Sequence, residues 1–130
     1  MLKKIIFFML LLLPASHVFC QPFNCSAFRE GRFRTADSRV GAIVITERNS
    51  MYQTESTETL KLSIRFSISW QDNCSYTLTL DKVIRNENKV DIPSNLTVTV
   101  KIIETTSQTY IEEITSSMAN GSYRAEVKRL

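Results

Sequence analysis

The most regular stretch of the chain is Leu60–Trp70, with the sequence LKLSIRFSISW. Every second residue in it is apolar, and the residues between them are serine, lysine or arginine. Side chains of a β-strand point alternately to its two faces, so this alternation predicts a strand with one buried face. A helix would spread the same apolar residues around its whole circumference. The segment therefore indicates a small β-protein with a hydrophobic interior.

Segments of β-character, separated by short polar turns, lie on both sides of this strand. Including it, the expected strands are 30–35, 40–46, 51–56, 60–70, 75–83, 96–103, 109–115 and 122–128. Connections this short favour a meander, in which successive strands are neighbours. The prediction is an all-β fold of seven to eight antiparallel strands, as an up-and-down barrel or strongly curved sheet. A two-sheet β-sandwich is the alternative.

The first 20 residues have the layout of a secretory signal peptide. Two lysines, Lys3 and Lys4, precede the nine apolar residues 5–13, and Pro14 ends that run. Nine apolar residues are too few to span a bilayer, which takes about 20, and no later stretch is apolar enough to do so. We expect residues 1–20 to be a signal peptide and 21–130 a single all-β domain. Export to the periplasm, the outer surface or the extracellular space follows from this.

The three cysteines allow two interpretations of the region after the signal. Cleavage after Cys20 would leave Cys25 and Cys74, and an even pair in an exported protein favours a disulfide. Two free buried thiols are the alternative. Cys20 could instead carry a lipid anchor, but that modification normally requires Gly, Ala or Ser before the cysteine, where this chain has Phe19.

Composition argues against several classes of function. The chain has 16 Lys and Arg against 13 Asp and Glu, and two of the lysines belong to the signal peptide. A domain so close to neutral lacks the concentrated positive charge that nucleic acid binding requires. His17, the one histidine, also lies in the signal, so histidine-dependent catalysis and metal ligation are not expected. Glu112 and Glu113 are adjacent on an expected strand and should point to opposite faces. We therefore expect no enzyme activity and no cofactor.

Four residues are candidates for a binding site. Arg48, Gln53 and Glu55 flank a tight turn between two expected strands, where they could line a barrel mouth and bind a polar ligand. Paired surface charges are the alternative for these three. Trp70 could stack on a ligand, although its place at the end of an inward-facing row favours a role in the core beside the disulfide.

Parts of the chain resemble a family of small exported bacterial proteins of unknown function. The residues that carry the resemblance are CSAFREGRF at 25–33, Glu47-Arg48 with Gln53-Thr-Glu55, and Trp70 followed by Cys74-Ser-Tyr76. Some members carry the label DNA topoisomerase IV, which a chain this short and exported does not support. The resemblance, over about residues 24–85, implies a common β-fold and pairing of Cys25 with Cys74. It supplies no catalytic residue.

The predicted function is binding without catalysis. A small barrel of the lipocalin-like kind would hold a small apolar or amphipathic ligand in its interior. The alternative is a periplasmic or cell-surface module that contacts a protein partner through an edge strand or a loop.

Overall fold

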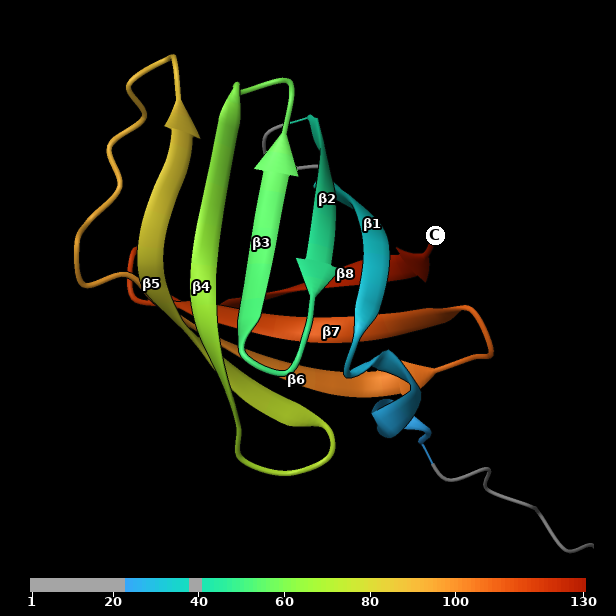
Figure 1. Ribbon diagram of the computed structural model, residues 1–130. Helices are drawn as coiled ribbons and strands as arrows, with labels where there is room; N and C mark the ends of the chain where they lie inside the picture. Colours follow the sequence, from blue (N-terminus) through green and yellow to red (C-terminus); the bar gives the residue numbers. More distant parts are fainter. Residues whose placement is uncertain (1–22, 38–40) are drawn as a thin grey trace, which may run out of the picture.

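The chain folds into a closed barrel of eight antiparallel strands in the computed structural model, which describes residues 23–37 and 41–130 (Figure 1). The predicted signal peptide and Cys20 lie outside these residues. One turn of 3-10 helix, η1 (Cys25–Phe28), precedes the barrel. The strands are β1 (Gly31–Asp37), β2 (Ala42–Arg48), β3 (Tyr52–Thr57), β4 (Leu62–Trp70), β5 (Ser75–Asn86), β6 (Thr97–Thr105), β7 (Thr109–Ser116) and β8 (Ser122–Arg129).

The strand order confirms the up-and-down barrel and not the sandwich. Each strand pairs with its neighbours in sequence, and β8 returns to pair with β1 through three residue pairs. The predicted strands match the observed ones to within about two residues at most ends, and the predicted start of the second strand, Val40, lies outside the described residues. Two differences have a clear structural reason. β4 begins at Leu62 because Lys61 has a left-handed φ of 49°. β5 continues to Asn86 because it follows β4 to its first residue, Leu62.

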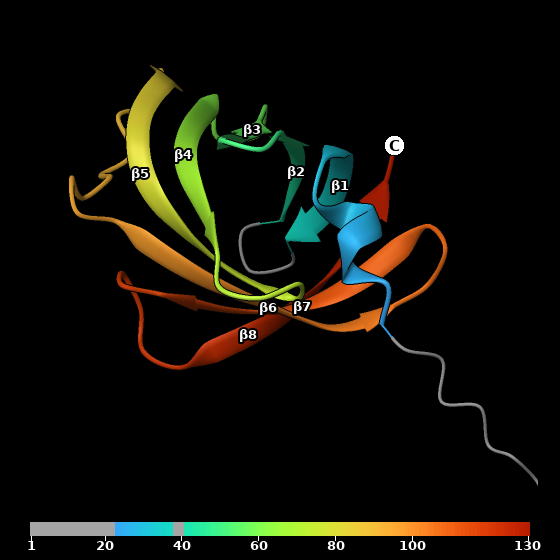
Figure 2. The same cartoon turned by 60° about the horizontal axis from the view of Figure 1, so that its bottom comes forward.

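The barrel has two different ends. The β2–β3, β4–β5 and β6–β7 turns lie at one end together with η1, and we call this end the base. The β3–β4, β5–β6 and β7–β8 connections lie at the other end, which we call the open end; the first two begin at the top of Figure 1. Figure 2 shows η1 lying against the barrel at the base.

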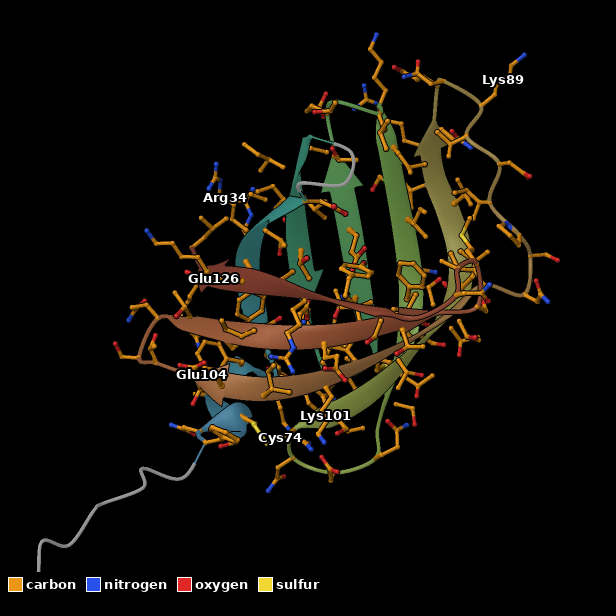
Figure 3. The ribbon with its side chains drawn as sticks, turned by 180° about the vertical axis from the view of Figure 1, so that it is seen from behind. Arg34, Cys74, Lys89, Lys101, Glu104 and Glu126 are labelled. Atoms are coloured by element: carbon orange, nitrogen blue, oxygen red, sulfur yellow. A yellow bond between two sulfur atoms is a disulfide. The ribbon has the colours of Figure 1, made fainter. Side chains whose placement is uncertain are left out.

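A disulfide joins η1 to the β4–β5 turn at the base. Cys25 and Cys74 are bonded with an S–S distance of 2.07 Å, across 49 positions of sequence, which confirms the predicted pairing (Figure 3). Arg129 at the end of β8 donates a hydrogen bond to the carbonyl of Ala27, so the last strand is also tied to η1. The base is thus fastened both covalently and by hydrogen bonding.

Aromatic rings fill the interior at the base. The Phe28 ring lies 5.0 Å from Tyr110, and Phe33 lies 5.9 Å from Tyr110 in an edge-on arrangement, as measured between ring centroids. Both phenylalanines are fully buried. Charged residues on the outer surface, such as Arg34, Lys101 and Glu126, are exposed (Figure 3). Among the described residues, no helix is long and apolar enough to cross a membrane.

The seam between β5 and β6 is short. These strands pair only from Ser75↔Lys101 to Thr79↔Thr97, with one further hydrogen bond from the Leu80 amide to the carbonyl of Leu96 at 3.0 Å. The rest of β5 continues beside β4 without pairing with β6. The connection that follows β5 carries Ile92 and Leu96 back to the barrel, where both contact the core. Figure 2 shows β5 diverging from β6 toward the open end.

Candidate functional site

A cavity of about 490 Å³ lies inside the barrel and extends to the open end. We call it the main cavity. Its walls include inward-facing apolar residues of three strands, β4, β5 and β6: Leu62, Ile64, Phe66, Leu78, Val98 and Val100. Three of these belong to the predicted alternating row of Leu60–Trp70, in which Ile64 and Phe66 are buried and the other four apolar residues are half-buried. A volume of this size lies within the range of about 300–1,000 Å³ that is typical of small-molecule sites.

Polar side chains occupy the inner end of the main cavity. Gln53 and Glu55 of β3, Tyr76 of β5 and Glu112 of β7 all line it. A small cavity of about 180 Å³ shares Gln53, Glu55 and Glu112 with it and is also lined by Arg48 and Tyr110. We call the whole group the polar floor: Arg48, Gln53, Glu55, Tyr76, Tyr110 and Glu112.

Arg48 is the centre of the polar floor. It is the last residue of β2, and the alternation along β2 turns its side chain inward, where it is 5% exposed. Its Nε donates to Gln53 Oε1 at 2.7 Å and its Nη1 to the carbonyl oxygen of Phe28 at 2.6 Å. Its Nη2 donates to the hydroxyls of Tyr76 at 2.8 Å and Tyr110 at 3.0 Å. One guanidinium therefore links β2, β3, β5, β7 and η1.

The surroundings of Arg48 keep it charged. Burial alone would lower its pKa, but Tyr76, Tyr110 and Glu112 outweigh that effect and the pKa is raised. The guanidinium carbon also lies 4.9 Å from the centroids of both the Phe33 and Tyr76 rings. Cation–π attraction of this kind is stronger where water is excluded.

Two half-buried carboxyl groups share the polar floor with this cation. Glu55 accepts a hydrogen bond from Gln53 Nε2 at 2.8 Å, and Glu112 accepts one from the Tyr76 hydroxyl at 3.5 Å. Burial, with a smaller contribution from Glu55, raises the pKa of Glu112 to about 7. Burial also raises the pKa of Glu55, although Gln53 and Arg48 oppose the shift. Both groups can accept hydrogen bonds, and Glu112 can exchange a proton near neutral pH.

The structure brings together three of the four predicted site residues. Arg48, Gln53 and Glu55 meet inside the barrel, at the inner end of the main cavity and not at its mouth as predicted. Surface ion pairing is wrong for this group, because Arg48 and Gln53 are 5% and 3% exposed. Trp70 lies apart from them, half-buried, with its ring centroid 4.6 Å from that of Tyr76 and the guanidinium of Arg29 4.6 Å away. It lines neither cavity described above.

Sequence reasoning missed Tyr76, Tyr110 and Glu112 as members of the site. Tyr110, Glu112 and Ile114 alternate on the inward face of β7, whereas Glu113 faces outward and pairs with Arg124. The opposite orientation of Glu112 and Glu113 is as predicted. Glu112 alternates with the apolar positions Tyr110 and Ile114, and this pattern is the signal that could have predicted its inward orientation.

Comparison with known proteins gives no family for this barrel. No family model, curated protein or solved structure matches the chain. The resemblance to small exported bacterial proteins therefore stays a prediction. No group of three or more His, Cys, Asp or Glu residues that could hold a metal ion was found within residues 23–37 and 41–130.

Proposed function

We propose that this protein binds a small apolar or amphipathic ligand inside its barrel and does not transform it. The main cavity carries this proposal. Its walls are apolar, its inner end is polar, and its outer end is bordered by connections such as those that hold Leu60, Ile92 and Met118. An apolar pocket with a few convergent polar groups is the usual form of a small-molecule site.

Binding outside the cytoplasm is part of the proposal. The Cys25–Cys74 disulfide suits an oxidising compartment, and the predicted signal peptide provides the route to it. Export by this route would place the cavity where ligands from the surroundings can reach it.

A protein–protein interaction module remains the second candidate, and one observation favours it. Val83 and Ile84 are 38% and 52% exposed on the part of β5 that has no pairing with β6. An exposed apolar stretch beside unpaired backbone could accept an added strand from a partner.

Filling the cavity tests the first candidate directly. The neutral dye Nile red, which fluoresces in apolar surroundings, should bind the intact oxidised protein at one site. Val98→Phe adds bulk to the wall of the main cavity, so the dye affinity should fall about tenfold or more, the equivalent of about 1.4 kcal/mol.

The neighbouring position provides the control. Thr99 is exposed on the outer face of the same strand, so Thr99→Phe should leave the dye affinity unchanged. Absence of dye binding, or equal effects of the two variants, would contradict binding within the barrel.

A further inference from the structure

The charged members of the polar floor that line the main cavity are both acidic. Glu55 and Glu112 both line this cavity, whereas Arg48 is not among the described residues that line it. Arg48 borders the small cavity behind them. A ligand that enters from the open end therefore meets two carboxyl groups at the inner end of the apolar wall.

The cation of the polar floor has little capacity left for a ligand. Arg48 has five N–H groups, and its four hydrogen bonds all go to protein acceptors. An anionic ligand would have to displace Gln53 or a tyrosine hydroxyl from a buried position. Loss of a buried hydrogen bond leaves its partner unsatisfied, which disfavours that exchange.

The two carboxyl groups, unlike Arg48, have hydrogen-bonding capacity left for a ligand. An ionised carboxylate offers about four acceptor positions. Within the described residues, Glu55 receives a hydrogen bond from Gln53 at 2.8 Å, and Glu112 receives a long one of 3.5 Å from Tyr76. Acceptors are therefore in surplus at this end of the cavity, and a ligand that brings hydrogen-bond donors would complement them.

Charge points in the same direction. Two acidic side chains, Glu55 and Glu112, share the polar floor with one cation, Arg48. Tyr76 and Tyr110 surround the same group, and neither supplies a positive charge. A cation that enters the cavity would balance the acidic excess.

An isolated hydroxyl gives a separate indication of a polar ligand group. Thr57 is 8% exposed and lines the main cavity. Its buried Oγ1 has no hydrogen-bond partner among the described residues. Buried hydroxyls in proteins are usually paired, so an unpaired one beside a cavity favours a partner that comes from the cavity.

We propose that the main cavity binds an amphipathic amine. The protonated amine donates to Glu55 and Glu112, and the apolar part of the molecule lies against the wall that includes Ile64 and Leu78. This inference rests on the proposed function, because it names the chemical class of ligand for the same cavity.

Three probes of equal chain length separate the possible head groups. Decylamine, decanol and decanoate are titrated at pH 8 against the Nile red complex of the intact protein. Decylamine should displace the dye at about a tenfold lower concentration than decanol, because a close buried charge pair contributes at least that factor. Decanoate should be the weakest of the three.

Matched variants locate the preference. Glu112→Gln and Glu55→Gln should each reduce the preference for decylamine over decanol about tenfold, while decanol continues to bind and shows that the cavity is intact. Glu113→Gln is the control, because Glu113 lies next to Glu112 but faces outward toward Arg124. It should leave the preference unchanged.

The pH dependence provides a readout that a purely structural role would not produce. Glu112 ionises near neutral pH in the free protein. Decylamine remains protonated at pH 8, like a lysine side chain, so its affinity should rise from pH 6 to pH 8 as Glu112 loses its proton. This rise should be smaller in Glu112→Gln.

The outcomes distinguish the two proposals. Equal or tighter binding of decanoate overturns the amine inference but leaves ligand binding in the barrel intact. An amine preference that survives both carboxyl variants, or that Glu113→Gln also removes, overturns it as well. Failure of Nile red and all three probes to bind overturns the proposed function itself.

Discussion

The two ends of the barrel interior are built in opposite ways. At the base, buried rings such as Phe28, Phe33 and Tyr110 pack against one another around Arg48. Toward the open end, the same closed sheet surrounds a cavity of about 490 Å³. Side chains that border empty space lose the dispersion contacts that a packed core provides. The base must therefore supply more than its share of the stability, and the hollow half is left free for binding.

Substitution of Arg48 should have the largest effect. In Arg48→Met, the two carboxyl groups of the polar floor lose their cation and four acceptors lose their donor. The free energy of unfolding, measured by urea titration, should therefore fall by about 3–5 kcal/mol. The stability of Arg48→Lys should lie between that of the wild type and that of Arg48→Met, because an ammonium keeps the charge but cannot reproduce the forked contacts.

The matched control is Arg32→Met. Arg32 forms an ion pair with Glu47 at 3.4 Å in which both side chains are more than half exposed. Its loss should change the free energy of unfolding by less than about 1 kcal/mol. Equal losses in the Arg32 and Arg48 variants would mean that the polar floor does not hold the base together.

Removal of the disulfide should have the next largest effect. In the double variant Cys25→Ser, Cys74→Ser, the unfolded chain regains the freedom of a loop of about 50 residues, which corresponds to about 3–4 kcal/mol in the chain-entropy description. Urea unfolding measures the loss. Nile red affinity, measured well below the unfolding midpoint, should stay within about twofold of the wild-type value, because the bond lies at the base and not in the cavity wall. A large loss of dye affinity in a variant that is still fully folded would contradict this separation between the base and the cavity.

Two isoleucines allow the same substitution at each end. Ile102 is 1% exposed and lies at the base, where its amide donates to the carbonyl of Cys74 at 2.7 Å. Ile102→Ala should reduce the free energy of unfolding by about 2–5 kcal/mol, because a new void forms in a packed region. Ile92 is half-buried beside the existing cavity, so Ile92→Ala should cost about 1 kcal/mol or less. A larger loss from Ile92 would show that the open end is not the weaker half.

The smallest effect concerns the pH dependence of stability. The pKa of Glu112 is raised from 4.5 to about 7, so between these values the folded state binds more protons than the unfolded state. Stability therefore falls as pH rises through this window, and Glu55 contributes in the same direction.

The variant Glu112→Gln removes the ionisation of this side chain. It should be more stable than the wild type at pH 8 by an amount on the order of 2 kcal/mol, and its pH slope should be smaller. Glu113→Gln should retain the wild-type slope. A wild-type protein whose stability rises from pH 5 to pH 7 would contradict the assignment.

The barrel could be predicted from the sequence because strand alternation is a local pattern. Leu60–Trp70 and its hairpin partner carry that pattern clearly, and short turns restrict the topology to a meander. Even the inward side chain of Arg48 follows from the alternation along β2, which also turns Thr46 inward. The prediction of a barrel mouth rests on the tight turn that Arg48, Gln53 and Glu55 flank, and a turn does not show which way its flanking side chains point.

The polar floor could not be predicted, because its members are distant in sequence. Arg48 meets Tyr76 and Tyr110 across separations of 28 and 62 residues, and the closure of the barrel alone brings them together. The size of the main cavity could not be predicted either. Its size depends on the curvature of the sheet and on how far each side chain reaches, and neither is encoded in a pattern of apolar and polar positions. The single turn of η1 has no periodicity to detect.

The return of β8 to β1 has a consequence for the route by which the chain folds. Every other strand pairing joins neighbours in sequence, and the hairpins that make them can form early at low entropic cost. The contact of Arg129 with Ala27 spans 102 residues, and the β1–β8 pairing beside it involves three residue pairs. Contacts between residues so far apart in the sequence form late, because the two ends of the chain must first be brought together. Barrel closure is therefore expected to follow the rate-limiting step, so substitutions at Arg129 should speed unfolding while leaving the folding rate nearly unchanged.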